Sequence, residues 1–417
     1  MPHKADYSLT VRPEDSQDPG TTFARLGLPE VRTVYQPVFD LRDGSVVGYE
    51  ALVRGESGSD LESPAQLFEA ARTADLVAEF DAACREAAVR GFHVNGSGPF
   101  ALFLNAEANT LGNAAERVPA SKQTVVIEIS EQALVENPDA LLHALARFRM
   151  EGWGVAIDDV GADSRSLALM PLLYPDVIKL DLRRLQQRDP ADVARIVGAV
   201  GAESERRQAL VLAEGIDSEE QLAAARAFGA QLGQGFLLGE PAPLPGALPE
   251  PGRKLRLTDS GGDLAGDPPY RRVTNWKRPT TGSRRLAEAT AGLIMRQALA
   301  LGETAVVLAA FPDEDHLQPD QAAELAELAK SIAFVGALSA PAELAEAGVR
   351  IGQLGPDDPL RGTWTVTALG PGLAACFVAC ESEDGTFQLA TSYDHDLVVE
   401  SALLIMARLR PLAPPAR

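Results

Sequence analysis

Six apolar, strand-like runs in the first 240 residues each carry an acid, an amide or a lysine at one end. The runs are 101–105, 125–128, 154–159, 177–181, 211–214 and 234–238, and their polar residues are Asn105, Glu128, Asp158, Asp159, Lys179, Asp181, Glu214 and Gln234. An earlier run, 47–52, holds Glu50 in its interior. Runs rich in Val, Ile and Leu on both faces are typical of parallel strands.

The placement of these polar residues predicts where the chemistry takes place. Side chains at the carboxyl ends of successive parallel strands gather on one face of a β/α barrel. Carboxylates that converge there repel one another in a low-dielectric cleft, unless a divalent cation neutralises them. We therefore expect an α/β fold with a TIM-like barrel, and a metal-dependent enzyme that acts on an anionic substrate.

The length and charge of the chain bound its partners. Its 417 residues are enough for a barrel of about 200 to 250 residues and a further domain. The formal net charge is −21, which argues against nonspecific binding to duplex nucleic acid or to an anionic membrane. An anionic ligand would then need local arginines and lysines together with a metal ion.

Cysteine usage and hydropathy predict the compartment. The three cysteines, Cys84, Cys376 and Cys380, lie in apolar neighbourhoods, and so sparse and odd a count suggests a reducing environment. No apolar stretch reaches the roughly 18 residues that span a bilayer, and the N-terminus lacks a hydrophobic signal core. We expect a cytoplasmic protein without a membrane partner.

Composition and periodicity divide the chain into four parts. Residues 1–25 are polar and acidic and predict a disordered arm, and residues 26–246 alternate strand-like and helical patterns, as a barrel does. Residues 247–270 are rich in Pro, Gly and Asp and predict a linker. Residues 271–417 predict a smaller mixed α/β domain, with helices at 284–301, 319–330 and 395–409.

Seven short motifs in the barrel region occur in the order of a known family. They are the segments 35–40 (YQPVFD), 50–54 (EALVR), 127–131 (IEISE), 158–161 (DDVG), 178–181 (IKLD), 213–217 (AEGID) and 234–236 (QGF). Together they resemble the EAL family of cyclic di-GMP phosphodiesterases over residues 31–244. The resemblance implies hydrolysis of cyclic di-GMP to linear pGpG by a homodimer.

The resemblance also implies roles for individual residues. It gives metal ligands for a two-ion Mg²⁺ or Mn²⁺ site, with Asp159 bridging both ions: Glu50, Asn105, Glu128, Asp158 and Asp159. Hard oxygen ligands of this kind suit both ions, and two such ions can activate water and stabilise a leaving alkoxide. It gives catalytic roles to Lys179, which would orient the attacking water, and to Glu214, a general base or a further metal ligand. It gives substrate contacts at Gln36, Arg54, Asp181, Asp217 and Gln234.

Each of these residues also has a simpler interpretation. A single Asp at the end of a strand is often a helix cap or a turn former, and a single Lys in such a run often snorkels to the surface. A barrel enzyme that acts on another phosphorylated metabolite is a further alternative, which would require the order of the motifs to be chance.

The loop that follows the aspartate pair departs from the family. Members usually continue Phe-Gly-Thr-Gly-Tyr-Ser-Ser-Leu, whereas residues 160–167 read VGADSRSL. In the family this loop supports metal binding and couples the active site to the dimer interface, and the counterpart of Glu131 anchors it. Asp217 stands where a Glu is usual. The altered loop favours a slow enzyme, or a cyclic di-GMP receptor or protein-interaction module without turnover, while the complete acid set favours the enzyme.

The last 140 residues resemble the DICT sensory domain more loosely. The similar segments are 309–311, 362–366 and 387–394, which are short and mostly apolar. The resemblance implies a regulatory domain that binds an unknown signal or a protein partner. A module that only packs against the barrel, or that makes a dimer, is the alternative.

Overall fold

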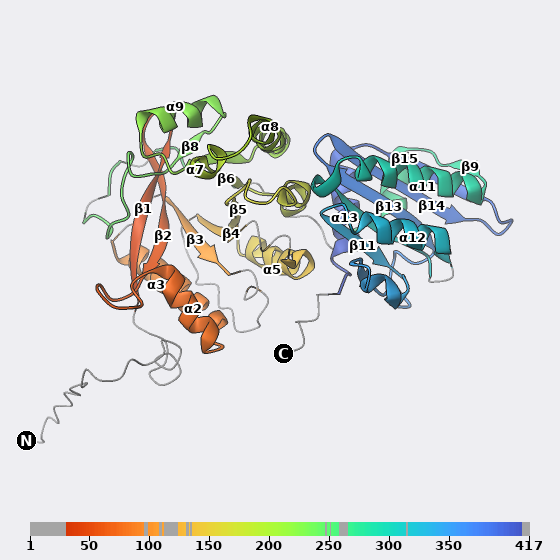
Figure 1. The fold of residues 1–417 in the computed structure, drawn as a ribbon, viewed down its shortest axis with the longest axis horizontal. Coiled ribbons are helices and arrows are strands. Elements are labelled where there is room, and N and C mark those ends of the chain that lie inside the picture. Colours follow the sequence, from red (N-terminus) through yellow and green to blue (C-terminus); the bar gives the residue numbers. More distant parts are fainter. Residues whose placement is uncertain are drawn as a thin grey trace, which may run out of the picture.

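The computed structural model contains a closed eight-stranded barrel followed by a seven-stranded sheet (Figure 1). It describes residues 31–95, 99–107, 111, 124–130, 133, 136–246, 248–250, 252–257, 266–313 and 316–410. The barrel and the second α/β sheet confirm the expected fold class. The predicted disordered arm, 1–25, lies outside the described residues.

The barrel alternates strands and helices along the chain. Its strands are β1 (Arg32–Asp40), β2 (Val46–Arg54), β3 (Ala101–Ala106), β4 (Val125–Ser130), β5 (Gly154–Asp158), β6 (Val177–Asp181), β7 (Leu210–Glu214) and β8 (Leu232–Gly233). Its helices are α2 (Pro64–Thr73), α3 (Val77–Asn95), α5 (Pro138–Met150), α6 (Ser166–Leu169), η2 (Met170–Leu173), α7 (Leu182–Leu185), α8 (Pro190–Arg207) and α9 (Glu219–Ala227).

The ends of the barrel sequence depart from a purely parallel pattern. Strands β2 to β8 pair in parallel order, but β1 is antiparallel to both β2 and β8. A short turn that includes Gly44, at φ +73°, joins β1 to β2, and so short a connection can only join antiparallel strands. The strand expected at 234–238 is wrong, because the amides of Leu238 and Gly239 bond back to the carbonyl of Gly235 and coil the chain.

Alternate residues of the strands fill the inside of the barrel, since successive side chains of a strand point to opposite faces. Below the site, this interior holds an apolar cluster. It contains Val38, Val47, Ala101, Phe103, Val126, Ala156, Val177, Leu212, Leu232 and Leu255. Leu255 belongs to the segment 247–270 that the composition predicts as a linker, so part of that segment packs into the barrel.

The second sheet has the strand order β12-β11-β10-β13-β14-β15-β9. Its strands are β9 (Thr280–Gly282), β10 (Val306–Ala310), β11 (Phe334–Leu338), β12 (Arg350–Gly352), β13 (Thr363–Gly370), β14 (Leu373–Glu381) and β15 (Phe387–Ser392). Its helical segments are α10 (Pro269–Trp276), α11 (Arg284–Leu299), η3 (Gly302–Thr304), α12 (Pro319–Leu328), η5 (Ala342–Ala345) and α13 (His395–Met406). The three expected helices form, each ending two or three residues early.

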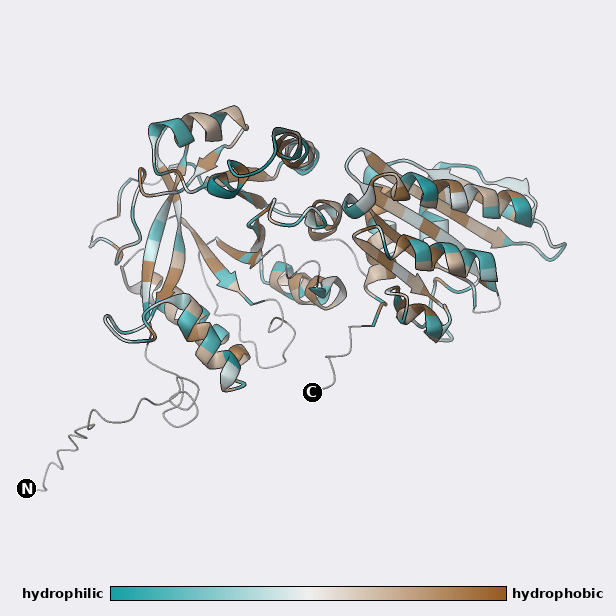
Figure 2. Ribbon diagram, in the orientation of Figure 1, coloured by the Kyte–Doolittle hydropathy of each residue, from teal (hydrophilic) through white to brown (hydrophobic). Residues whose placement is uncertain are grey.

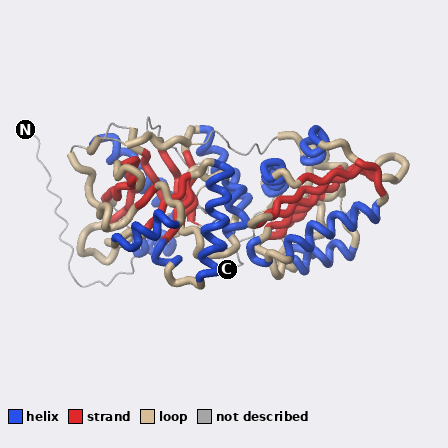
Figure 3. Tube along the Cα trace, turned by 90° about the horizontal axis from the view of Figure 1, so that it is seen from above, coloured by secondary structure: helices blue, strands red, loops and turns tan. Residues whose placement is uncertain are grey.

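Helices cover both faces of the second sheet (Figure 3). Helices α11 and α12 pack on one face, where Val307, Val366 and Phe377 belong to the same apolar cluster as Ile294 and Leu325. Helices α10 and α13 pack on the opposite face. Figure 2 shows apolar residues concentrated in the strands of both sheets.

The face of the second sheet that carries α13 adjoins the barrel. One apolar cluster includes Leu167 and Met170 of the barrel together with Leu369, Val399 and Leu403 of the second domain. Eight residues of α13 are buried, as a helix held between two layers must be. No helix among the described residues is long and apolar enough to cross a membrane.

Candidate active site

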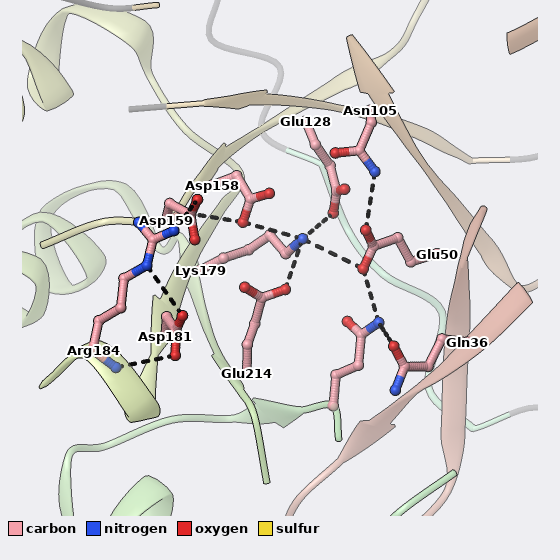
Figure 4. Close-up of polar contacts among 11 residues, drawn as sticks. Gln36, Glu50, Asn105, Glu128, Asp158, Asp159, Lys179, Asp181, Arg184 and Glu214 are labelled. Carbon is pink, nitrogen blue, oxygen red and sulfur yellow. Dashed lines mark hydrogen bonds and ion pairs between the residues drawn. The ribbon is translucent and has the colours of Figure 1, made fainter. Parts of the chain in front are cut away.

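A buried lysine lies among four carboxylates at the carboxyl end of the barrel (Figure 4). Nζ of Lys179 is 2.8 Å from Glu128 Oε1 and 2.8 Å from Glu214 Oε1. It is 3.3 Å from Asp158 Oδ1 and 3.5 Å from Glu50 Oε2. These residues come from β2, β4, β5, β6 and β7. On four of these strands the site residue lies two positions after a residue of the apolar barrel interior, so both side chains point inward.

Lys179 does not snorkel to the surface, because its side chain is only 1% exposed. Burial alone lowers the pKa of Lys179, but the surrounding carboxylates outweigh it and hold that pKa well above its usual range. A buried ammonium needs such compensation, since an unpaired buried charge costs several kcal/mol. The structure therefore places a permanent positive charge at the centre of the acid cluster.

Amide side chains fix the orientation of Glu50. Nδ2 of Asn105 donates to Glu50 Oε1 at 3.0 Å, and Nε2 of Gln234 donates to Glu50 Oε2 at 2.8 Å. Nε2 of Gln234 also donates to Oε1 of Gln36 at 2.9 Å. Burial raises the pKa of Glu50, but the charge of Lys179 and the hydrogen bonds from the two amides outweigh burial. The pKa of Glu50 therefore lies below its ordinary value.

Two other carboxyl groups of the cluster have raised pKa values. Burial, followed by the charge of Glu50, raises the pKa of Glu128 well above its usual range. Burial, with the charges of Asp158 and Glu50, raises the pKa of Glu214 to about 8. Within the described chain, Oε2 of Glu128 is buried and accepts no hydrogen bond. The cluster thus holds four carboxyl groups around the single positive charge of Lys179.

Asp159 follows β5 in a left-handed conformation, at φ +57°. This conformation turns it away from Lys179 and toward Arg184, whose Nη2 lies 3.2 Å from Asp159 Oδ2. Its backbone N–H donates to Oδ1 of Asp158 at 2.9 Å. Burial and the charge of Asp158 raise the pKa of Asp159.

The oxygens at this end of the barrel fit a divalent cation. Carboxylate oxygens of Asp158, Asp159 and Glu214 lie within 4.8 Å of one another, and each residue is partly accessible. Carboxylate oxygens are hard ligands of the kind that Mg²⁺ and Mn²⁺ prefer. The pKa values of Glu128, Asp159 and Glu214 are raised, and Oε2 of Glu128 accepts no hydrogen bond among the described residues. A bound cation would neutralise these carboxylates and give that oxygen a partner.

The remaining residues that the sequence predicts for the site lie in different places. Gln36 and Gln234 join the network of Glu50, whereas Arg54 donates to the carbonyl of Val53 at 2.8 Å and contacts none of the acids. Asp181 is the N-cap of α7 and lies 3.4 Å from Arg184 Nε, so it also has the structural role of a helix cap. Glu131 lies outside the described residues.

Asp217 belongs to the rim of the site. It pairs with Arg183 and accepts a hydrogen bond from the backbone N–H of Phe236 at 3.1 Å. The Arg183 side chain lowers the pKa of Asp217. The guanidinium of Arg183 lies 6.0 Å from the centre of the Phe236 ring, which is 57% exposed.

Two clefts flank the acid cluster. One, of about 300 Å³, runs from Glu50 and Asn105 toward helices α2 and α3. The other, of about 240 Å³, is bordered by Gln36, Glu214 and Phe236. Because the cluster belongs to the walls of both, a ligand longer than either cleft can lie across it.

Sequence reasoning missed two features of these clefts. The first is a buried ion pair between Asp81 and Arg85 of α3, which lines the larger cleft. Its signal in the sequence is the four-residue spacing of opposite charges on a helix. The second is Phe236, whose exposure had no signal, because an apolar run from 234 to 238 predicts a buried strand.

Comparison with known proteins identifies the family. The EAL domain model matches residues 24–241, just over half of the chain. The chain therefore belongs to the EAL domain family.

Curated relatives match the same region. The cyclic di-GMP phosphodiesterase NbdA of Pseudomonas aeruginosa is 30% identical over 230 residues, which cover 50% of this chain and 29% of NbdA. The uncharacterized EAL-domain containing protein YkuI of Bacillus subtilis is 27% identical over 228 residues, which cover 52% of this chain and 56% of YkuI. The chain thus spans well under two thirds of both relatives.

Solved structures also match the barrel region. The PaMucR phosphodiesterase in a c-di-GMP complex is 26% identical, with a TM-score of 0.45, and the match covers 51% of this chain and 92% of that one. Klebsiella pneumoniae BlrP1 in a manganese/cy-diGMP complex is 26% identical, with a TM-score of 0.46, and the match covers 52% and 57% of the two chains.

Proposed function

We propose that this protein is a metal-dependent phosphodiesterase that hydrolyses cyclic di-GMP to linear pGpG. The observation that carries the proposal is the buried Lys179 among four carboxylates at the carboxyl ends of barrel strands, the face where such barrels place their chemistry. Membership of the EAL family supports it, and so does the similarity to a relative named as a cyclic di-GMP phosphodiesterase.

The carboxylates are proposed to bind divalent cations. Asp158, Asp159 and Glu214 would hold one ion, and Glu50, Asn105 and Glu128 extend the set of oxygens next to it. Bound Mg²⁺ or Mn²⁺ would supply charge neutralisation at the phosphate and an activated water. Gln36 and Gln234 act through Glu50, since their hydrogen bonds fix the rotamer of its carboxylate.

Lys179 is proposed to stabilise negative charge that develops on the reacting phosphate. Glu128 and Glu214, each 2.8 Å away, hold its ammonium in place. The positive charge is therefore already oriented when the reaction occurs, and the site need not rearrange to present it. The pair of Asp81 and Arg85 in the larger cleft and the exposed ring of Phe236 in the smaller one can contact the nucleoside parts of a dinucleotide. An aromatic ring gives a base a surface for stacking.

The second domain is proposed to regulate this activity. Its support is the apolar cluster that joins it to α6 and η2, directly after the aspartate loop. The homodimer that the resemblance implies stays a prediction, as does a signal that binds to the second domain.

The test is to incubate the full chain with cyclic di-GMP and either Mg²⁺ or Mn²⁺, and to separate the nucleotides by ion-pair chromatography. Glu50→Gln, which removes a charge at constant size, serves as the inactive variant, and the exposed Glu56→Gln serves as its matched control. We expect pGpG from the parent and from Glu56→Gln, and at least a 100-fold lower rate from Glu50→Gln and from samples with EDTA.

An absence of product would contradict the proposed hydrolysis. Calorimetry with cyclic di-GMP then distinguishes the second candidate function, a receptor that binds the dinucleotide without turnover. The altered loop at 160–164 favours that candidate, because it lacks the second glycine and the aromatic residue that family members usually have after the aspartate pair.

A further inference from the structure

We propose that Glu303 and Arg350 of the second domain are positioning residues for the acid cluster. Glu303 contacts the loop that follows β5, the strand that carries Asp158, and Arg350 contacts the backbone carbonyl of Glu136, eight residues after Glu128 of β4. The proposal deepens the proposed function and rests on it for its effect on catalysis, while the positioning itself is measurable without turnover.

The loop after β5 has a conformation that needs support. Asp159 is left-handed, at φ +57°, and Gly161 follows at φ +107°. A non-glycine residue in the left-handed region is strained, and this conformation persists only where its surroundings hold it. Within the barrel, the N–H of Val160 donates to the carbonyl of Lys179 at 3.1 Å, and Arg188 donates to the carbonyl of Ala162 at 2.6 Å.

The second domain adds a contact to the outer side of the same loop. Oγ of Ser164 donates to Oε2 of Glu303 at 3.0 Å, and Glu303 belongs to η3. The carboxylate of Asp163, and beyond it that of Glu303, raises the pKa of Arg165. Glu303 therefore interacts with two residues of the loop, five and six positions after Asp159.

A second contact holds the chain after β4. Nη2 of Arg350 donates to the backbone carbonyl of Glu136 at 2.6 Å, and Glu136 lies eight residues after Glu128. Arg350 begins β12, is 9% exposed, and has its guanidinium 5.7 Å from the centre of the Phe334 ring. A buried guanidinium held in this way makes a directional contact, and hydrogen bonds from charged donors are stronger than neutral ones.

Both contacts, that of Glu303 with Ser164 and that of Arg350 with Glu136, are made by the second domain. Glu303 and Arg350 both belong to the second domain, and its apolar face packs on α6 and η2, which continue the loop after β5. A shift of this domain against the barrel would therefore move Ser164 and Glu136 together. Substitution of residues that orient the metal ligands without binding the metal themselves typically lowers metal affinity or activity by 10- to 100-fold.

The experiment compares the full-length parent with the double variant Glu303→Ala, Arg350→Met. We expect Mn²⁺ affinity, measured by calorimetry, to fall by about 10-fold. We also expect faster hydrogen–deuterium exchange in metal-free protein for peptides that cover residues 159–169. Glu303→Gln, whose amide oxygen can still accept from Ser164, should keep the parent exchange rate at that loop, and Ser164→Ala should match Glu303→Ala there.

The exposed residues Glu346 and Arg361 of the same domain supply the controls Glu346→Ala and Arg361→Met, which should leave both measurements unchanged. Folded variants with parent Mn²⁺ affinity and parent exchange in the loop would overturn the positioning role. If the parent fails to hydrolyse cyclic di-GMP, the exchange measurement still decides this proposal, since it requires neither metal nor substrate.

Discussion

At the scale of single residues, Lys179 determines the character of the site. Its ammonium lies 2.8–3.5 Å from four carboxylates, and it has almost no contact with solvent. One positive charge cannot balance four negative ones, so protons or cations must supply the remainder. The same residue therefore stabilises the fold and leaves the acid cluster in need of a cation.

Lys179→Met is expected to lower the free energy of unfolding by about 3–5 kcal/mol in EDTA at pH 7, because it leaves buried carboxylates without their partner. Urea denaturation measures the change. Added Mn²⁺ should restore part of the loss, since a cation that binds only the folded state stabilises it, and tighter binding stabilises it more. Lys330→Met, which breaks an exposed pair with Glu327, is the matched control and should change stability by at most about 1 kcal/mol. Equal effects of the two substitutions would contradict a buried role for Lys179.

The sequence predicts much of this cluster, because polar residues at the ends of apolar runs stand out. Glu50, Glu128, Asp158 and Glu214 all meet at Lys179. The substrate contact predicted at Arg54 stays a prediction, since a spacing of four from Glu50 along a strand does not give the direction of a long side chain. No pattern within β6 shows that Lys179 is buried, because its partners lie on other strands.

At the scale of elements, the sequence predicts the strands whose apolar runs are long. Strands β4, β5 and β6 each contain four or more buried residues in sequence, and runs of Val and Ile mark them. Strand β8 has two residues and β12 has three, which is too short for any periodicity. The reversal of β1 was not predicted either, since it depends on the turn at Gly44 rather than on the apolar pattern of the strand.

Gly161→Ala is expected to destabilise the aspartate loop. Gly161 has φ +107°, and an added Cβ would lie 3.3 Å from Cδ1 of Ile196. We expect a loss of about 1–3 kcal/mol in the free energy of unfolding, with weaker Mn²⁺ binding, because the strained backbone would rearrange. Gly198→Ala in α8 is the control, since its Cβ would meet no atom within 4 Å and should stabilise the helix by about 0.5–1 kcal/mol. A stable Gly161→Ala variant with parent Mn²⁺ affinity would show that the loop tolerates other conformations.

At the scale of the whole molecule, the contact between the domains is the feature that the sequence could not predict. The sequence of α13 predicts an apolar helix, but it does not indicate that one side of the helix packs against a barrel. Two of the polar contacts at this boundary join α8 to α13: Arg206 lies 3.0 Å from Nε2 of His395, and Arg207 lies 2.9 Å from Asp396. The pairs are separated by 189 residues along the chain, so no local pattern encodes them.

The histidine in this boundary makes the stability of the molecule depend on pH. Burial, followed by the charges of Arg206 and Arg207, lowers the pKa of His395 from 6.5 to about 4, while Asp396 opposes the shift. Arg206 donates to the ring, which therefore must be neutral in the folded protein. As the pH falls below 6.5, the unfolded chain binds a proton at this residue and the folded chain does not, so folding stability decreases. Above pH 6.5 both states are neutral and the effect vanishes.

His395→Gln separates this contribution from all other titrations, since its amide oxygen can still accept from Arg206 and carries no proton equilibrium. Between pH 7 and pH 5 the parent should lose about 1 kcal/mol more of its free energy of unfolding than the variant, after allowance for partial solvent screening. Urea denaturation at the two pH values, in the same salt and with EDTA, gives the difference. His143→Gln, at an exposed position of the barrel helix α5, is the control for the exchange of His for Gln. If His395→Gln loses as much stability as the parent between pH 7 and pH 5, the ring is accessible to protons in the folded state and the domains do not enclose it.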